Sequence, residues 1–239
     1  NVLEYCLLSL EKMALGGIFD WVHGGITRYS TDRFWKVPHF EKMLYDNGQI
    51  MGVFAKAFRA SAKGTFLTAA EAVANFLEAE MKLSNGLYAS ALDADSATPE
   101  AAREEGGYYT WTSAELDNLK LEQRSLFNDY FDITPYSAWE GKYILHRTNS
   151  LEVHCKEWGI SIAEGLRLEN NWHLALKNAS KERIQTHAKP IRDNKALCTW
   201  NALVVLGFFE LHLAAPQKGY MEKAVELLSA MRAHLLEEG

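Results

Sequence analysis

The densest set of reactive side chains lies between residues 23 and 47. This stretch contains HGGITRYSTD, then a tryptophan, then VPHFEKMLYDN. Gly24 and Gly25 permit a close backbone approach that other residues cannot make, and Pro38 fixes how the chain enters the helix predicted to follow it. His39 and Glu41 would then lie in the first helical turn, where side chains and free backbone amides can bind hydroxyl groups or an anion.

Each polar residue of this stretch also has a purely structural explanation. His39 could satisfy a free backbone amide, and Glu41 could stabilise the positive end of the helix dipole. Asp46 could pair with Lys42 one turn earlier. Asp46 and Asn47 nevertheless fall on or beside the predicted buried stripe of the helix, where an unpaired polar group costs roughly 1–3 kcal/mol. A polar cavity or a water-filled channel would supply the partners that they need.

A second set of carboxylates follows a β-prone segment. Asp93 and Asp95 alternate along the chain, so they point to the same side of an extended segment. One interpretation is a cation site, although the glycine and the distal glutamate of an EF-hand loop are missing. The others are a solvated loop and a pair of carboxylates for general acid/base chemistry on a glycosidic or anomeric carbon.

The third set lies later in the chain. It comprises Glu140 in a WEGK segment, Arg192 and Asp193 in an RDNK segment, and the pair Trp200 and Asn201 near the start of a predicted helix. If alternate helices line a ring, the helices that follow these polar residues all begin at the same end of the ring. We therefore expect six side chains to lie at one end of the helical array: His39, Glu41, Asp46, Asp93, Arg192 and Asp193.

Helical periodicity dominates the chain. Apolar residues recur at three- and four-residue spacing, and Gly or Pro marks most of the boundaries. The predicted helices span residues 2–15, 39–62, 66–83, 113–131 in pieces, 161–180, 199–214 and 218–237. The segment between 87 and 111 is instead rich in Gly, Ser, Asp and Tyr, which predicts a β-hairpin excursion. The predicted fold is mainly α and consists of antiparallel helical hairpins.

Composition excludes several classes of partner. The chain has 239 residues with 25 basic and 31 acidic side chains, and its formal net charge of −6 provides no positive field for nucleic acid or anionic lipid. It contains no apolar run of the roughly 20 residues that a membrane span needs, and its start lacks the pattern of a signal peptide. Three cysteines without a C-x-x-C pair favour a reducing compartment. We expect a cytoplasmic protein without a metal or a cofactor.

The motifs taken together resemble those of a known family. They are G-G-I-x-D at 16–20, the run from Val37 to Asn47, D-A-D-S at 93–96, G-G-Y-Y-T-W at 106–111, W-E-G-K, and R-D-x-K followed by W-N. This set is similar to that of the thioredoxin-domain-containing family called spermatogenesis-associated protein 20 in animals and YyaL in bacteria. The resemblance covers nearly the whole chain, and the run from Val37 to Asn47 is long and highly specific.

The resemblance implies an architecture. Members of this family join an N-terminal thioredoxin-like domain to an α/α toroid that is similar to N-acylglucosamine 2-epimerases and six-hairpin glycosidases. Residues 1–239 match the first part of the toroid, so we expect the thioredoxin-like domain and the C-terminal hairpins outside this chain. The implied fold is part of an (α/α)6 toroid with a small β-hairpin insertion.

The resemblance also places the family's motif positions on this sequence. They fall on Arg28, Tyr29, Trp35, His39, Glu41, Tyr45, Asp46, Asn47, Asp93, Asp95, Glu140, Arg192, Asp193, Trp200 and Asn201. We assign acid/base chemistry to His39, Asp93 and Asp95, and contacts with a substrate to the other positions.

Two functions are compatible with these residues. The first is binding or modification of a small carbohydrate. Epimerisation or isomerisation would need a base and an acid at a sugar carbon, and glycoside hydrolysis would need two carboxyl groups beside the glycosidic oxygen. The alternative is a non-catalytic scaffold or interaction module that accompanies the thioredoxin-like redox domain.

A partial ring predicts self-association. A toroid closes by packing its last hairpin on its first, so a half toroid leaves two apolar flanks without partners. The residues concerned are Val2, Leu3, Leu7, Leu10, Leu227, Leu228, Met231 and Leu235. At roughly 25 cal/mol per Å², a few hundred Å² of exposed apolar surface drives association by several kcal/mol. We predict pairing or aggregation in light scattering across a concentration series; a stable monomer at high concentration would contradict it.

Overall fold

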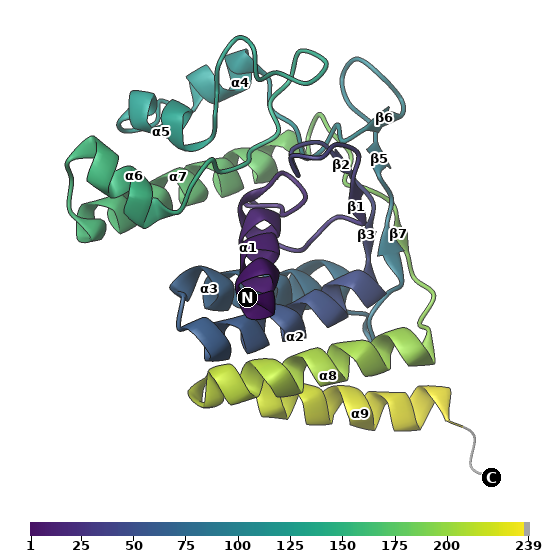
Figure 1. Cartoon of the computed structure of the whole chain (residues 1–239). Helices are drawn as coiled ribbons and strands as arrows, with labels where there is room; N and C mark the ends of the chain where they lie inside the picture. Colours follow the sequence, from purple (N-terminus) through teal and green to yellow (C-terminus); the bar gives the residue numbers. More distant parts are fainter. Residues whose placement is uncertain (237–239) are drawn as a thin grey trace.

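The elements of the fold are taken from a computed structural model that describes residues 1–236. The helices are α1 (Val2–Leu15), α2 (Leu44–Ser61), α3 (Gly64–Phe76), the π-helical turn η1 (Leu77–Met81), α4 (Ser113–Asn118), α5 (Arg124–Tyr130), α6 (Leu151–Trp158), α7 (Ile162–Arg183), α8 (Cys198–Ala214), the 3-10 turn η2 (Pro216–Lys218) and α9 (Tyr220–Leu235) (Figure 1). The strands are β1 (Tyr29–Ser30), β2 (Pro38–His39), β3 (Lys42–Met43), β4 (Ala91–Leu92), β5 (Asp95–Ser96), β6 (Glu104–Glu105) and β7 (Arg192–Asp193).

Two parallel helices, α2 and α8, form the centre of the first core. Contacts between them advance in the same direction along both helices. Near their starts the ring of Tyr45 packs on Trp200, with centroids 4.8 Å apart, and near their ends Arg59 binds Glu210 at 3.0 Å. Both helices therefore begin at the same end of the molecule, and the residues that precede them come close together.

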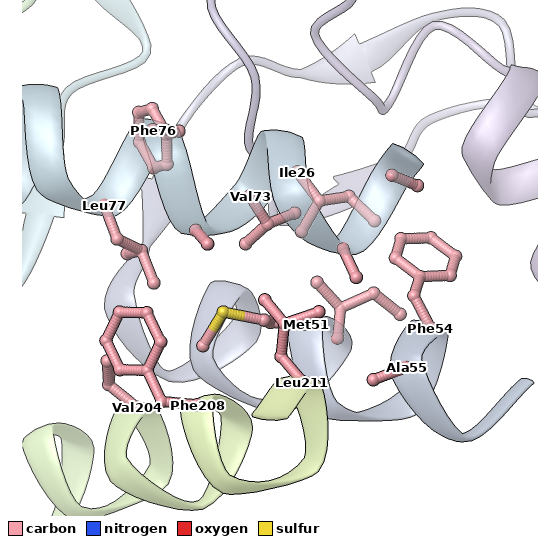
Figure 2. Packing of buried hydrophobic residues seen from close by; sticks show 14 of the residues in the cluster. Ile26, Met51, Phe54, Ala55, Val73, Phe76, Leu77, Val204, Phe208 and Leu211 are labelled. Carbon is pink, nitrogen blue, oxygen red and sulfur yellow. The ribbon is translucent and has the colours of Figure 1, made fainter. Parts of the chain in front are cut away.

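Each of these helices is followed by a second helix that returns along it. α3 follows α2 after a short turn, and α9 follows α8 through η2 (Figure 1). Aromatic rings pack within both hairpins, Phe54 on Phe66 and Phe208 on Tyr220. Figure 2 shows the resulting core, in which buried side chains of α2, α3 and α8 meet. The alternation of apolar and polar positions that predicted these helices thus produces one continuous apolar interior.

A second core lies among α4, α5, α6 and α7. Its largest members are Trp111, Phe127, Tyr130 and Trp172, all of which are buried. Full burial of an apolar side chain of this kind stabilises the fold by about 1.5–3 kcal/mol. The three short helices are held on α7 in this way, and α7 in turn carries the buried Arg183 at its end.

Short strands connect the loops to the starts of α2 and α8. β4 pairs in antiparallel fashion with both β3 and β7, so the segments that precede the two helices lie on either side of one strand. β3 leads directly into α2, and β7 lies a few residues before α8. β1 pairs with β2, and β5 with β6. The three-stranded sheet of β3, β4 and β7 lies at the end of the molecule where α2 and α8 begin, and it brings the polar loops together there (Figure 1).

The predicted fold class is confirmed. The described chain is mainly helical, has helical hairpins, and contains a small β-hairpin formed by β5 and β6 within the predicted excursion. The helices predicted over 2–15, 66–83, 113–131, 161–180, 199–214 and 218–237 are all present, and position 237 of the last one lies outside the described residues. Within residues 1–236, no helix combines the length and the apolar character that crossing a membrane requires.

Two predictions about these elements were wrong, and one helix was missed. The helix predicted from residue 39 begins at Leu44, because the preceding residues pair with β1 and β4 instead of forming helical hydrogen bonds. The apolar flanks predicted at both ends are exposed only in part: Val2 of α1 is 81 % exposed, whereas Leu227 and Met231 of α9 are buried against the first core. α6 was not predicted, since a helix of two turns gives little periodic signal.

The contact between α2 and α8 makes a testable prediction. A Cβ on Gly207 would lie 2.4 Å from the carbonyl oxygen of Gly48, whereas a Cβ on Gly52 would meet its nearest atom at an ordinary 3.4 Å. We expect Gly207→Ala to lower the free energy of unfolding by about 1–3 kcal/mol through overpacking. Gly52→Ala is the matched control and should be neutral or raise it by up to ~1 kcal/mol, because Ala favours a helix. Urea unfolding of both variants decides, and equal effects would contradict this packing.

Candidate functional site

A lysine without solvent exposure lies at the centre of the candidate site. The Nζ of Lys42 donates hydrogen bonds to Oδ2 of Asp20 at 2.7 Å and to the carbonyl oxygen of Gly24 at 2.8 Å. The same ammonium group lies over the rings of Phe76 and Tyr109, 4.7 and 4.6 Å from their centroids. Two hydrogen bonds and two aromatic faces therefore replace the water that this charge loses.

The charges of this pair depend on each other. Burial lowers the pKa of Lys42, and Asp20 opposes that effect. Burial alone would raise the pKa of Asp20, but Lys42 and His23 outweigh it and hold the pKa of that carboxyl well below its usual range. Removing one partner of such a buried pair typically costs 3–5 kcal/mol, because the other charge is left unpaired. Asp20 and Lys42 thus form a fixed ion pair under the site.

The two glycines of the predicted close approach make this arrangement possible. Gly24 and Gly25 have φ angles of 79° and 81°, which side chains other than glycine rarely adopt. A Cβ on Gly24 would lie 2.4 Å from the carbonyl oxygen of Ala72, and one on Gly25 would lie 2.6 Å from the ring of Phe76. The loop therefore packs against α3, and the carbonyl of Gly24 faces Lys42.

A cavity of about 450 Å³ lies against this ion pair. Besides Lys42, its polar and aromatic lining comprises His23, Phe76, Glu80, Tyr108, Tyr109, Lys189, Arg192 and Asn194. Glu80 binds Lys189 at 2.9 Å, and Arg192 donates through Nη1 to the carbonyl oxygen of Glu80 at 3.0 Å. The cavity thus presents a carboxylate, an imidazole, several cationic donors and the rings of Phe76 and two tyrosines to a ligand.

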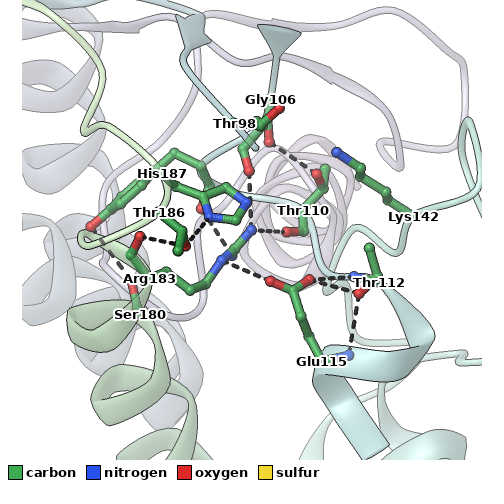
Figure 3. A network of polar contacts seen from close by, with 12 residues as sticks. Thr98, Gly106, Thr110, Thr112, Glu115, Lys142, Ser180, Arg183, Thr186 and His187 are labelled. Atoms are coloured by element: carbon green, nitrogen blue, oxygen red, sulfur yellow. Dashed lines mark hydrogen bonds and ion pairs between the residues drawn. The ribbon is translucent and has the colours of Figure 1, made fainter. Parts of the chain in front are cut away.

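A network around Arg183 holds the two tyrosines in place (Figure 3). Its guanidinium group is buried and donates to the carbonyl oxygens of Gly107, Tyr108 and Thr110 at 3.1, 3.3 and 2.9 Å. It also forms an ion pair with Glu115 at 3.0 Å. The loop that carries the aromatic lining is therefore anchored to α7 through its backbone.

A relay of side chains links the ion pair to α7. Nδ1 of His23 lies 3.0 Å from Oδ2 of Asp20, and Nε2 lies 2.6 Å from Oγ of Ser180. The order Asp–His–Ser is that of a nucleophilic triad. Ser180, however, is 2 % exposed and does not line the cavity, whereas His23 does and stacks on Tyr108. We interpret the relay as a connection that orients His23 and not as a nucleophile.

The predicted residues His39 and Glu41 lie in a separate ionic cluster. Nδ1 of His39 lies 2.7 Å from Oε1 of Glu105, and its ring stacks on Tyr29 at 5.0 Å. Oε2 of Glu41 accepts a hydrogen bond from Nη1 of Arg28 at 3.0 Å. These side chains belong to an extended segment and do not line the cavity beside Lys42.

Asp46 and Asn47 have different environments although they are adjacent. Asn47 is fully buried, where it accepts from the amide of Ile26 at 2.8 Å and donates to the carbonyl of Met43 at 2.8 Å. Asp46 is partly buried and its Oδ2 has no hydrogen-bond partner among the described residues. Burial, aided by Glu41, raises the pKa of Asp46 to about 6 against the opposing charge of Arg28.

Asp46 faces a second cavity of about 580 Å³. This cavity also contains the predicted residues Arg28, Tyr29 and Trp35. The predicted residues are therefore divided between two cavities, because Arg192 lines the first and these four line the second. The expected gathering at one end of α2 and α8 is present as a region but not as a single pocket.

Asp93 and Asp95 point to the same side, where both bind one arginine. Arg103 forms an ion pair with Asp95 through Nε and lies 3.4 Å from Asp93 through Nη2. The guanidinium group is well exposed and lies on the β5–β6 hairpin. Neither carboxylate lines the cavity beside Lys42.

The remaining predicted residues take part in local packing and ion pairs. Asn201 is fully buried and binds the backbone of Tyr88 through both its amide oxygen and its amide nitrogen. Asp193 pairs with Lys195 at 2.9 Å, and Glu140 lies exposed in a turn. Tyr45 and Trp200 pack on each other between α2 and α8.

Sequence reasoning missed the residues nearest the centre of the first cavity. Lys42 was predicted to lie in a helical turn, and Asp20, Glu80 and Lys189 were not singled out. The sequence did contain a signal for two of these residues, because Asp20 belongs to the G-G-I-x-D motif and Lys42 to the VPHFEKMLYDN run on which the family resemblance rests. Their contact across more than twenty residues depends on the loop between them.

The fold and site therefore define a mainly α chain with a buried ion pair under a polar, aromatic cavity. Spermatogenesis-associated protein 20 of Mus musculus is 30 % identical over 255 residues, which cover 98 % of this chain and 32 % of that protein. The protein of the same name from Homo sapiens matches with the same figures. An uncharacterized protein of Caenorhabditis elegans is 29 % identical over 90 % of this chain and 32 % of its own length.

These relatives confirm the family resemblance predicted from the motifs: homologues named spermatogenesis-associated protein 20 align with nearly the whole chain. The chain spans about a third of the length of these relatives. No protein-family model matches the sequence.

Solved structures of sugar-converting enzymes also align with the chain. The alignment with a D-mannose isomerase covers 96 % of this chain and 52 % of the isomerase chain, with 14 % identity and a TM-score of 0.37. The alignment with the cellobiose 2-epimerase of Spirochaeta thermophila covers 97 % of this chain and 67 % of the epimerase chain, with 16 % identity and a TM-score of 0.31. Because these scores lie below 0.5, the fold assignment rests on the chain's own helices and strands.

Asp46 gives the site a testable pH dependence. Its pKa of about 6 in the folded chain exceeds its ordinary value of 3.8, so folding disfavours the ionised form. The free energy of unfolding should therefore fall as the pH rises from about 4 to about 6, and Asp46→Asn should remove that loss. We expect the variant to be more stable by about 1–2 kcal/mol near pH 8 and equal near pH 4.

Urea unfolding at the two pH values measures this difference. The control is Glu226→Gln, which replaces an exposed carboxylate on α9 and should change stability little at either pH. A benefit of Asp46→Asn that is the same near pH 4 and pH 8 would show that ionisation of Asp46 is not its cause.

Proposed function

We propose that the cavity beside Lys42 binds a small carbohydrate. The observation that supports this most directly is the combination of one carboxylate, several cationic donors and two tyrosine rings around a fixed ion pair. Sugars carry many hydroxyl groups that both donate and accept hydrogen bonds, and their ring faces pack on aromatic side chains. Tyr108 and Tyr109 would supply the packing surface, and Glu80, Arg192 and Asn194 would bind hydroxyl groups.

The reaction that suits this cavity is proton transfer at a carbon beside a carbonyl group. Glu80 would take the proton, and the positive charges of Lys42 and Arg192 would stabilise the negative charge that develops on oxygen. Return of the proton to the opposite face of the same carbon gives an epimer, and return to the neighbouring carbon gives an isomer. Hydrolysis needs two carboxyl groups around the ligand, and Glu80 is the carboxylate that lines this cavity among the described residues.

The predicted acid/base residues have a different part in this proposal. His39, Asp93 and Asp95 do not line the cavity, whereas Glu80 does. We therefore assign proton transfer to Glu80 and not to these three residues. Arg192 keeps its predicted place as a substrate-binding residue.

A non-catalytic scaffold is the second candidate function. It is favoured by the same ion pairs, because most of the predicted site residues are bound by neighbours in the chain: His39 by Glu105, and Asp95 by Arg103. Such a scaffold would accompany the thioredoxin-like domain expected outside this chain, in the cytoplasm. On either function, the helical hairpins would be part of a larger α/α toroid, and the exposed apolar residues of α1 would contact further hairpins or a second copy.

Isothermal titration calorimetry with mono- and disaccharides tests the carbohydrate proposal. We expect Glu80→Gln to weaken binding by about tenfold or more, because hydrogen bonds to a charged group contribute about 1.5–3 kcal/mol. Glu71→Gln is the matched control: it breaks a comparable ion pair, with Lys218 at 2.7 Å, outside this cavity. Equal affinity of the two variants, or no binding by the folded protein at millimolar sugar, would favour the scaffold.

A further inference from the structure

A group of side chains that could bind a metal ion lies beside the second core, remote in sequence from the cavity beside Lys42. It consists of Asp129 near the end of α5 and of His154 and Glu157 on α6, each of which offers one ligand atom. Nδ1 of His154 lies 3.3 Å from Oδ2 of Asp129 and 3.8 Å from Oε2 of Glu157. All three ligand atoms lie within 4.8 Å of one another.

The imidazole of His154 supplies the decisive observation. The side chain is 2 % exposed, and Nδ1 is buried without a hydrogen-bond partner among the described residues. Nε2 lies 2.9 Å from the hydroxyl oxygen of Thr148 and can donate to it. In that tautomer Nδ1 carries a lone pair that faces two carboxylates, and a cation between them would satisfy all three groups.

The spacing of the three atoms fits a first-row divalent ion. Metal–ligand bonds of about 2.0–2.2 Å in a tetrahedron separate the ligand atoms by roughly 3.4 Å, close to the distances from Nδ1 to the two carboxylates. Contacts around the ligands would keep them in place: Nε1 of Trp158 donates to Oδ2 of Asp129 at 2.8 Å, and the ring of His154 packs against the rings of Tyr130 and Trp158.

We propose that Asp129, His154 and Glu157 form a binding site for a zinc-type divalent cation. One nitrogen and two carboxylate oxygens are a ligand set that zinc accepts, and the well-exposed carboxylates leave a fourth position for water. The ion would join α5 to α6, two of the three short helices that pack with α7. Its role would be to stabilise this layer, independently of any sugar in the other cavity.

Zinc chloride added to the full, tag-free chain after treatment with EDTA tests the proposal. We expect one equivalent to bind in calorimetry, and the Tm to rise by about 5 °C or more at a hundredfold excess over Kd. Cobalt(II) in place of zinc should give the visible absorption of a tetrahedral site. Glu157→Gln replaces an exposed ligand without disturbing the core, and it should weaken binding at least tenfold.

The matched control is Glu152→Gln, an exposed glutamate at the start of the same helix, which should bind zinc as the unmodified chain does. Asp129→Asn gives a second ligand variant on another helix. Absence of a zinc-dependent Tm shift would overturn the proposal, as would equal affinity of the Glu157→Gln and Glu152→Gln variants. A direct His154–Asp129 ion pair, seen as an imidazolium in NMR with zinc present, would also overturn it.

Discussion

The ion pair between Lys42 and Asp20 is the interaction to which the rest of the site is fitted. Taking two charges out of water is costly, and their attraction offsets that cost only when further hydrogen bonds satisfy both groups. The carbonyl of Gly24 and the imidazole of His23 supply those bonds, and two aromatic faces cover the ammonium group. A pair of this kind adds little net stability, but it tolerates few alternative arrangements of the surrounding chain.

Several segments must therefore meet around one lysine. The glycine loop can approach α3 because neither Gly24 nor Gly25 carries a Cβ, which would collide with that helix. The 106–111 loop brings Tyr109 over the ammonium group, and Arg183 fixes that loop from the end of α7. The cavity consequently takes Phe76 and Glu80 from α3 and η1, and Tyr108 from the loop that Arg183 of α7 holds. On the proposed function, a site whose charges are already paired would bind a ligand with little reorganisation.

Ion pairs with neighbouring residues engage the side chains that the motifs had indicated as catalytic. His39, Glu41, Asp93 and Asp95 are the side chain types expected at a catalytic centre, yet each lies close to an ionic partner in space. Arg28 and Glu41 flank the β1–β2 pair, and Arg103 precedes the second strand of the β5–β6 pair; each of these strands is only two residues long. Strands this short leave little periodic signal, so the partners of these residues were not apparent beforehand.

The sequence by itself determined most of the helices and the outline of the fold. The spacing of apolar residues along a helix is a local property, and it marks the side of the helix that becomes buried. The sequence also identified the glycine pair at 24 and 25 and the polar character of Asp46 and Asn47. Only the tertiary structure decided that α2 begins at Leu44, that Lys42 turns inward to Asp20, and that Glu80 joins Arg192 at one cavity. Those contacts join residues far apart in the chain, and electrostatic partners at such separations leave no periodic pattern in sequence. Pairing in space, not the type of residue, determines which charges are available to a ligand.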